Sequence, residues 1–233
     1  MRNMIGLLQK IDALFKSARS KPTKGRRKTA GQSLVEFGIT LPVLILLFTG
    51  MVEFGFMLNT YLSLQDAIRT SARRYSLENP QIKVNGAVVD DPTFYQGAAD
   101  AVVNDLMPSV DTAARQVFVD PTRDNVLISV ITISVDEAPD PDVIDSIIRH
   151  PNNSQFFKLY NDTSPATQYS DTKITETVTA NGGVPVDAGL LIIEVFYSYE
   201  GVLHLPWTEP FFSEANPSML YASTIMPLVA AKP

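Results

Sequence analysis

The chain contains no cysteine and only two histidines, His150 and His204. Without cysteine it can form neither a disulfide framework nor a thiolate nucleophile, so it folds without cross-links in whatever compartment it occupies. It also lacks the His-Glu-x-x-His, Gly-x-Ser-x-Gly and phosphate-binding glycine-loop patterns. We therefore expect a protein that is not an enzyme and that holds no cofactor and no metal.

Basic residues are scarce in most of the chain and concentrated at its start. Residues 1–30 carry nine Lys and Arg side chains against one acid, a net charge of +8, whereas residues 31–233 have a net charge of −14. A basic arm can bind nucleic acid or anionic lipid. This arm has no aromatic residue between Lys16 and Lys28 and directly precedes an apolar run, so we expect the lipid bilayer as its partner and no nucleic acid.

Charge is absent from the sixteen residues Phe37 to Val52, FGITLPVLILLFTGMV. Counted from Leu34 to Leu58, past Glu36 and Glu53, the run would form about 37 Å of helix, which is long enough to cross a bilayer. We therefore predict one membrane-spanning helix with the two glutamates near its ends. We expect the basic side in the cytoplasm and the later residues outside, because Lys and Arg favour the cytoplasmic side.

Two ordinary explanations of such a start are a cleaved secretory signal and an uncleaved signal anchor. The residues after the apolar core, FTGMVEFGFML, offer no clean small-x-small site, which argues against the first. The second stays open. Neither explains Glu36, because a carboxylate in hydrocarbon costs at least roughly 2.5–3.5 kcal/mol.

The basic leader ends in Gly31, followed by Gln32, Ser33, Leu34, Val35, Glu36 and Phe37. At this junction the chain resembles the type IV pilin family, whose precursors are cut after such a glycine by a prepilin peptidase of the inner membrane. The resemblance implies a processing site between Gly31 and Gln32. It also implies subunit docking at Glu36 and Phe37, since the carboxylate, fifth in the mature chain, can pair with the new α-ammonium of a neighbour.

Residues 33–76 look more narrowly like the TadE-like minor pseudopilins of the tight-adherence (Flp-type, type IVb) pilus system. The shared features are Val35-Glu36-Phe37, Leu41-Pro42, Gly50 through Gly55, and Ala72-Arg73. The segments IIEVFYSYEGVLHLP and MLYASTIMPL are similar as well. The resemblance implies four kinds of partner: prepilin peptidase, other pilins and pseudopilins, the assembly platform in the membrane, and the bilayer. It places the protein in the inner membrane or in the pilus.

Pro42 lies inside the predicted helix, where it removes one backbone hydrogen bond and favours a kink. The kink is either a flexible point used in assembly or an ordinary feature of a membrane helix. After the apolar run the helix continues as an amphipathic one to about Tyr75, and Pro80 stops it. The residues expected on its buried face are Leu58, Tyr61, Leu62, Ile68, Ala72 and Tyr75.

The rest of the chain predicts an α+β fold, in which the long helix packs on a small antiparallel sheet. The expected parts are a basic cytoplasmic leader (1–31), the transmembrane and amphipathic helix (32–78) and an extracytoplasmic α+β domain (79–233). A helix is expected from the cap Asp91 to Pro108, and Asn181-Gly182-Gly183 is expected to form a turn. Strands are expected at 125–135, 172–180, 189–201 and 219–229, and a surface excursion at 136–171.

Two further features have competing explanations. The acidic segment DEAPDPDVID (136–145) could bind Ca²⁺, but it lacks the glycine and the final glutamate of an EF-hand loop, so we expect a solvated loop. Trp207, Phe211 and Phe212 could form a partner-binding patch or a corner of the core, and we expect the core.

The sequence thus predicts a membrane-anchored minor pseudopilin. The alternative is an uncleaved single-span binding or sensing domain, and a tethered hydrolase fits the residues poorly.

Overall fold

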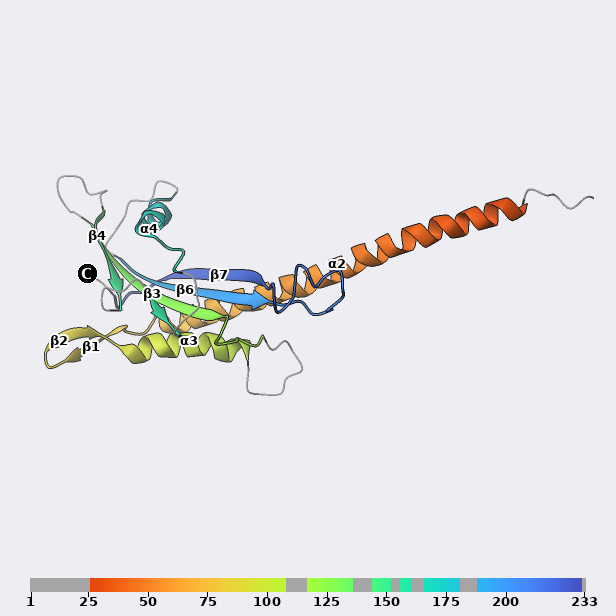
Figure 1. Cartoon of the computed structure of the whole chain (residues 1–233). Helices are drawn as coiled ribbons and strands as arrows, with labels where there is room; N and C mark the ends of the chain where they lie inside the picture. The colour runs from red at the N-terminus through yellow and green to blue at the C-terminus, as the bar shows by residue number, and fades with distance from the viewer. Residues whose placement is uncertain are drawn as a thin grey trace, which may run out of the picture. The chain divides into compact units, whose positions relative to one another are not determined.

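The structure, a computed structural model, describes residues 26–107, 117–135, 144–151, 156–160, 166–180 and 188–231 (Figure 1). The chain divides into two units, Met1–Thr49 and Gly50–Pro233. The leader lies almost wholly outside the described residues, as does the turn expected at 181–183. The three-part division of the chain therefore stays a prediction.

The first described element is α2 (Arg26–Tyr75), a single helix of 50 residues that contains Pro42. Pro42 has no N–H to donate to the carbonyl of Gly38 one turn earlier, yet the residues on both sides of it are helical. The last turn carries Arg73 and Arg74, whose charges are favourable at the negative end of the helix dipole. The predicted long helix and its end before Pro80 are confirmed.

In the second unit, α2 buries a stripe that runs along one of its sides. The buried residues of this stripe are Leu64, Ala67, Ile68, Ser71 and Ala72. The expectation that Leu58 and Leu62 belong to the buried face is wrong, since these side chains are 46% and 55% exposed. They share a side of the helix with Asp66 and Arg69, next to the buried stripe. The spacing of apolar residues alone does not distinguish these two neighbouring sides.

A five-stranded antiparallel sheet forms the centre of the second unit, so the predicted α+β fold is confirmed. Its strands are β3 (Asn125–Val135), β4 (Ile144–His150), β5 (Phe157–Lys158), β6 (Ala188–Tyr199) and β7 (Ser218–Pro227). They lie in the order β4-β3-β6-β7, and β5 pairs with β3 beside β4. The strands predicted at 125–135, 189–201 and 219–229 are therefore present.

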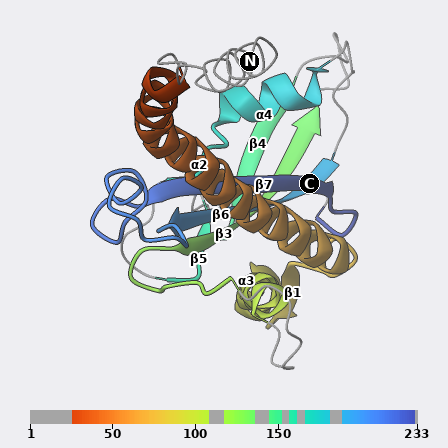
Figure 2. The ribbon, with the colours of Figure 1, turned by 90° about the vertical axis from the view of Figure 1, so that its right-hand side faces the viewer.

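Both faces of this sheet are covered, by different helices. On one face, Val126, Ile128 and Val130 of β3 lie opposite Val195, Ile193 and Leu191 of β6, in one cluster with α2 and α3 (Pro92–Leu106). Figure 2 shows α2 crossing this face. On the other face, a second cluster contains Ile131, Ile133 and Ile192 together with Tyr169 and Ile174. The two central strands are therefore hydrophobic on both sides.

Helix α3 begins as the sequence predicts. Asp91 is its N-cap and accepts a hydrogen bond from the backbone N–H of Thr93 at 2.9 Å, and Pro92 occupies the first helical position. Its small residues let it lie close to α2. The closeness is shown by a hydrogen bond of 2.8 Å that the Ser71 hydroxyl of α2 donates to the backbone carbonyl of Ala98. Helix α3 thus completes the core between α2 and the sheet.

The strand predicted at 172–180 is wrong, because these residues form α4 (Asp171–Val178). Ser170 caps this helix by accepting from the backbone N–H of Lys173 at 3.3 Å. Ile174 and Val178, four residues apart, both join the second cluster, as a helical spacing allows. In a short run of alternating Thr, Ile and Val, the strand and helix periods fit equally well, so the local pattern does not decide between them.

The surface excursion predicted at 136–171 is also wrong in part, since it contains the sheet strands β4 and β5. A hairpin of β1 (Gln81–Val84) and β2 (Ala87–Asp90) was not predicted. Its turn is Asn85-Gly86, both with positive φ, as a tight hairpin requires. His150 Nδ1 lies 2.8 Å from the Asp90 carboxylate and connects this hairpin to the end of β4.

Gly189 marks a close approach of the C-terminal segment to β6. Its carbonyl accepts from the backbone N–H of Leu228 at 2.7 Å. A Cβ at this position would lie 2.3 Å from the Leu228 carbonyl oxygen and 2.2 Å from that of Ala231. Both neighbours are backbone atoms, so no side-chain rotation can relieve the contact.

We predict that Gly189→Ala lowers the free energy of unfolding by about 1–3 kcal/mol or more, because the added methyl group must displace the backbone of the C-terminal segment. The measurement is chemical denaturation of the full chain in detergent micelles. Gly55→Ala is the control, since a Cβ there meets nothing within 4 Å and alanine favours a helix. Equal stability of Gly189→Ala and the wild type would contradict the close packing.

Candidate functional site

The residues of the predicted processing and docking sites lie together near the start of α2. Gly31, Gln32, Glu36 and Phe37 are all exposed, and Phe37 is 60% exposed. The Gln32 side-chain amide donates to Glu36 Oε1 at 3.2 Å. Residues 32 and 36 therefore share one side of the helix, one turn apart. Pro42 lies in the same helix, six residues further on, and takes no part in this contact.

The surface of this part of α2 is apolar and uncovered. Within Gly31–Tyr75 the described chain has one helix whose length and composition allow it to cross a membrane. Its large apolar residues from Leu34 to Phe48 are exposed, unlike those in the core helix of a soluble protein. So long an exposed apolar surface requires lipid or other apolar helices around it. The helix has the properties of a single-pass membrane anchor.

Immediately after the apolar run, Glu53 is completely buried. Its Oε1 accepts hydrogen bonds from the Tyr199 hydroxyl and from the backbone N–H of Val202, each at 2.7 Å. Its Oε2 accepts from the backbone N–H of Leu203 at 2.9 Å. The end of β6 and the loop after it thus enclose the carboxylate with three donors, which offset much of the cost of burying it.

Gly201 gives the loop the conformation that this enclosure needs. Its φ of +82° is in the left-handed region, and a Cβ would lie 3.1 Å from Glu53 Oε1 and 2.9 Å from Phe212 Cβ. Burial and the hydrogen bond to Glu53 raise the pKa of Tyr199, so its hydroxyl remains a donor at neutral pH. Sequence reasoning placed Glu53 at the end of the span but gave it no partner. The Tyr-Glu-Gly sequence at the end of β6 was the available signal.

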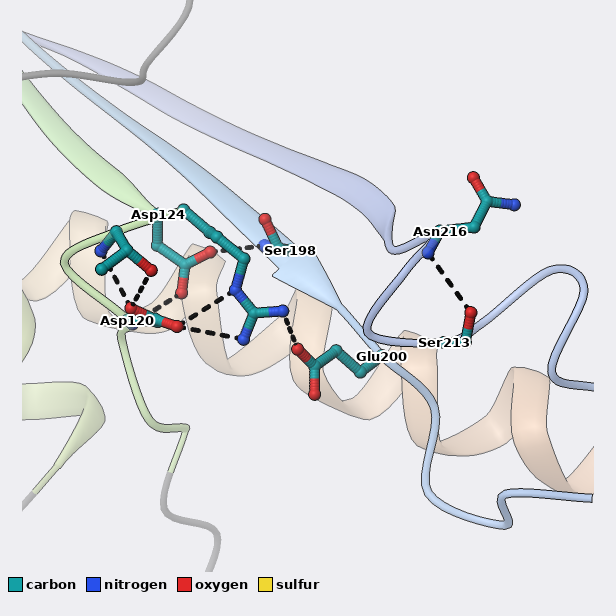
Figure 3. A network of polar contacts seen from close by, with 8 residues as sticks. Asp120, Asp124, Ser198, Glu200, Ser213 and Asn216 are labelled. Carbon is teal, nitrogen blue, oxygen red and sulfur yellow. Dashed lines mark hydrogen bonds and ion pairs between the residues drawn. The ribbon is translucent and has the colours of Figure 1, made fainter.

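A second polar network lies beside this loop (Figure 3). Asp124 is 2% exposed and accepts from the backbone N–H of Asp120 at 2.8 Å and of Ser198 at 2.7 Å. Burial raises the pKa of Asp124, against the effect of these two donors. Arg123 pairs with both Asp120 and Glu200. The network fixes the segment before β3 to the end of β6, next to the residues that hold Glu53.

Glu194 of β6 repeats the arrangement on the other face of the sheet. It is completely buried and accepts from the Tyr221 hydroxyl at 2.8 Å and from the backbone N–H of Gln168 at 2.9 Å. The Thr167 hydroxyl donates to it as well. Sequence reasoning missed this carboxylate too. In both cases one glutamate accepts hydrogen bonds from a connecting segment that is neither helix nor strand.

The other candidate residues have mixed outcomes. Trp207 and Phe211 are 41% and 65% exposed, so the expectation that they form a core corner is wrong for them. Phe212 does pack inward, with its ring 5.9 Å from that of Tyr199. Most of the acidic segment 136–145 lies outside the described residues. Among the residues described, no group of three His, Cys, Asp or Glu side chains could hold a metal ion.

Residues 31–73 match a family model that has the description TadE-like protein. We refer to this stretch as the TadE-like segment, after the family that it resembles. The resemblance stated from the sequence is thereby confirmed for α2. No curated protein and no solved structure matches the chain. The TadE-like segment begins at Gly31 and contains Glu36, Pro42 and Glu53, so it joins the exposed junction to the buried carboxylate in one helix.

We predict that Glu53→Gln lowers the free energy of unfolding by about 1–3 kcal/mol, because the amide nitrogen cannot accept a hydrogen bond from the backbone of the loop. The change is measured by chemical denaturation of the full chain in detergent, followed by circular dichroism. Glu36→Gln is the matched control on the same helix, and being exposed it should change stability by less than about 0.5 kcal/mol. Equal effects of the two substitutions would argue against the enclosure of Glu53.

Proposed function

We propose that this protein is a membrane-anchored minor pseudopilin that takes part in assembly of a tight-adherence type IV pilus. The observation that carries the proposal is the TadE-like segment, whose match begins at the proposed cleavage residue itself. The exposed apolar surface of α2 supports it, because a pilin helix must pass from lipid into a bundle of similar helices. The match favours a structural role over an enzymatic one.

In this proposal the protein crosses the inner membrane once. The leader remains in the cytoplasm, as its excess of Lys and Arg favours, and the domain with the sheet lies outside. The acidic domain then starts or caps the pilus, or contacts its other components, rather than forming the bulk of the fibre.

Maturation is proposed to occur by cleavage between Gly31 and Gln32 by prepilin peptidase. Both residues are exposed, and a Cβ at Gly31 would meet nothing within 4 Å. The glycine is therefore not required by the packing of this chain. A requirement for it would come from the close approach of the peptidase to the backbone.

Docking is proposed to use the Glu36 carboxylate. Cleavage creates an α-ammonium at Gln32, one helical turn from Glu36, as the existing contact between the two side chains illustrates. In a filament the ammonium of one subunit can pair with the Glu36 of its neighbour, in apolar surroundings formed by the exposed side chains of α2. A pair in such surroundings fixes register, since a misplaced subunit leaves a charge without its partner.

Cleavage is tested by intact-mass and terminal-peptide mass spectrometry of the membrane-bound protein. We expect a chain that begins at Gln32 in cells with the peptidase and a full-length chain in cells without it. Gly31→Leu should retain the leader without affecting the fold, because the space around Gly31 is open. A full-length wild-type chain in cells with active peptidase would favour the alternative, an uncleaved single-span binding or sensing domain.

Docking is tested separately with Glu36→Ala. We expect cleavage to continue while piliation falls by about tenfold or more, because an unpaired buried ammonium costs roughly 3–5 kcal/mol. Pili are counted by electron microscopy, and the mature N-terminus is checked by mass spectrometry. Glu78→Ala removes an exposed carboxylate beyond the end of α2 and serves as the control. Normal piliation in Glu36→Ala would eliminate the docking role without touching the cleavage site.

A further inference from the structure

We propose that the loop formed by residues 200–217 rests on the outer surface of the bilayer and inserts Val202, Trp207 and Phe211 among the lipid headgroups. The inference depends on α2 crossing a membrane and on the contacts of the loop. It does not depend on cleavage or on a role in a pilus. Lipid is thus the proposed occupant of an apolar surface that has no assigned function.

The hydrogen bonds of the loop place it at a defined level along α2. Val202 and Leu203 donate their backbone N–H groups to Glu53, which directly follows the uncharged run that ends at Val52. A bilayer core takes up about 20 helical residues, so a span that starts near Phe37 ends near Phe56. The bonds to Glu53 therefore hold the loop at the level where the helix leaves the hydrocarbon.

The loop exposes apolar side chains of a kind that suits the boundary between lipid and water. Val202, Trp207 and Phe211 are 51%, 41% and 65% exposed. Tryptophan in particular is favoured at the boundary between lipid and water, where its ring is in apolar surroundings and its N–H remains hydrated. Near the same level, Phe54 and Leu58 of α2 are also more than 40% exposed. Both the loop and the part of α2 around Glu53 thus expose apolar side chains.

The loop holds these side chains in place with its own hydrogen bonds. The backbone N–H groups of Phe211 and Phe212 donate to the Thr208 carbonyl, each at 3.0 Å. The Asn216 amide donates to the Pro210 carbonyl at 2.8 Å, and Phe212 packs against Tyr199. Three exposed apolar residues on a loop with its own hydrogen bonds form a ready-made surface, so little conformational entropy is lost on contact.

The charges of the loop indicate which lipids suit it. Glu209 and Glu214 are exposed, whereas the loop contains no Lys or Arg. Contact therefore relies on apolar insertion, and anionic lipid would repel the loop. Zwitterionic phosphatidylcholine is accordingly the appropriate probe.

Trp207 is the single tryptophan of the chain, so its fluorescence reports the loop directly. The full chain is reconstituted in phosphatidylcholine vesicles, and only protein that floats with the vesicles is measured. We expect lipids brominated near the headgroup end of their chains to lower Trp207 emission by about twofold, because the ring lies at this depth. Acrylamide in the water should quench Trp207 less than it quenches free tryptophan.

The matched control moves the tryptophan away from the proposed surface. In the double variant Trp207→Phe with Leu77→Trp, the only tryptophan follows the end of α2, about 33 Å beyond Glu53 along the helix. Leu77 is 86% exposed, so its replacement should not disturb the fold. Its emission should be insensitive to brominated lipid. Equal quenching at both positions, or full exposure of Trp207 to acrylamide without lipid quenching, would overturn the proposal.

A second variant tests whether the rest of the surface contributes. Phe211→Ser should reduce the quenching of Trp207 by brominated lipid, because it removes the most exposed apolar anchor of the three. Val88→Ser, at a similarly exposed apolar residue of β2, should leave the quenching unchanged. Unaltered quenching in Phe211→Ser would contradict a shared insertion of the loop.

Discussion

The enclosure of Glu53 is the constraint on which the arrangement of the second unit depends. Its carboxylate is buried at the point where the apolar run of α2 ends, and its hydrogen-bond donors come from the end of β6 and the following loop. A buried carboxylate cannot change partners cheaply, since any other position of the loop would leave the charge without donors. One side chain of the helix thereby fixes both the sheet and the loop on it.

The rest of the core is held together by hydrophobic packing on both faces of the sheet and by two further buried carboxylates. Small and aliphatic residues of α2 and α3 fill one face of the sheet, and α4 with Tyr169 covers the other. Asp124 and Glu194 each accept hydrogen bonds from backbone N–H groups and so fix a connecting segment to the sheet. Hydrophobic packing thus gives the domain its layers, and the three carboxylates determine where the connecting segments lie.

Much of this fold could be predicted because its strongest patterns are local. The long helix, the cap of α3 at Asp91 and the strands β3, β6 and β7 each carry their signal within a few adjacent residues. The errors arose where the decision is made by contacts far away in the sequence. Leu58 and Leu62 have the spacing of a buried stripe, and only the sheet determines which side of α2 is covered. The alternation in α4 fits two periods, and β4 is a strand because β3 supplies its partner.

In the candidate site, too, the sequence predicts contiguous motifs but not contacts between distant residues. The junction from Gly31 to Phe37 is a contiguous motif, so sequence alone drew attention to it, and the TadE-like match covers it. The role of Glu53 could not be found in this way, because its partners are at Tyr199, Val202 and Leu203. A glutamate at the end of an apolar run has the same local pattern whether it faces water or is enclosed by a loop.

That separation has a consequence for biosynthesis. Glu53 and Val202 are 149 residues apart, so the helix is made long before the donors that enclose its carboxylate. At a synthesis rate of about 5–20 residues per second, the carboxylate waits roughly 7–30 seconds for them. During that interval the Glu53 carboxylate of the nascent chain lies directly after the apolar run, with only water or the insertion machinery to solvate it. The order of synthesis thus makes the completion of this domain a late event, governed by the arrival of the strand β6.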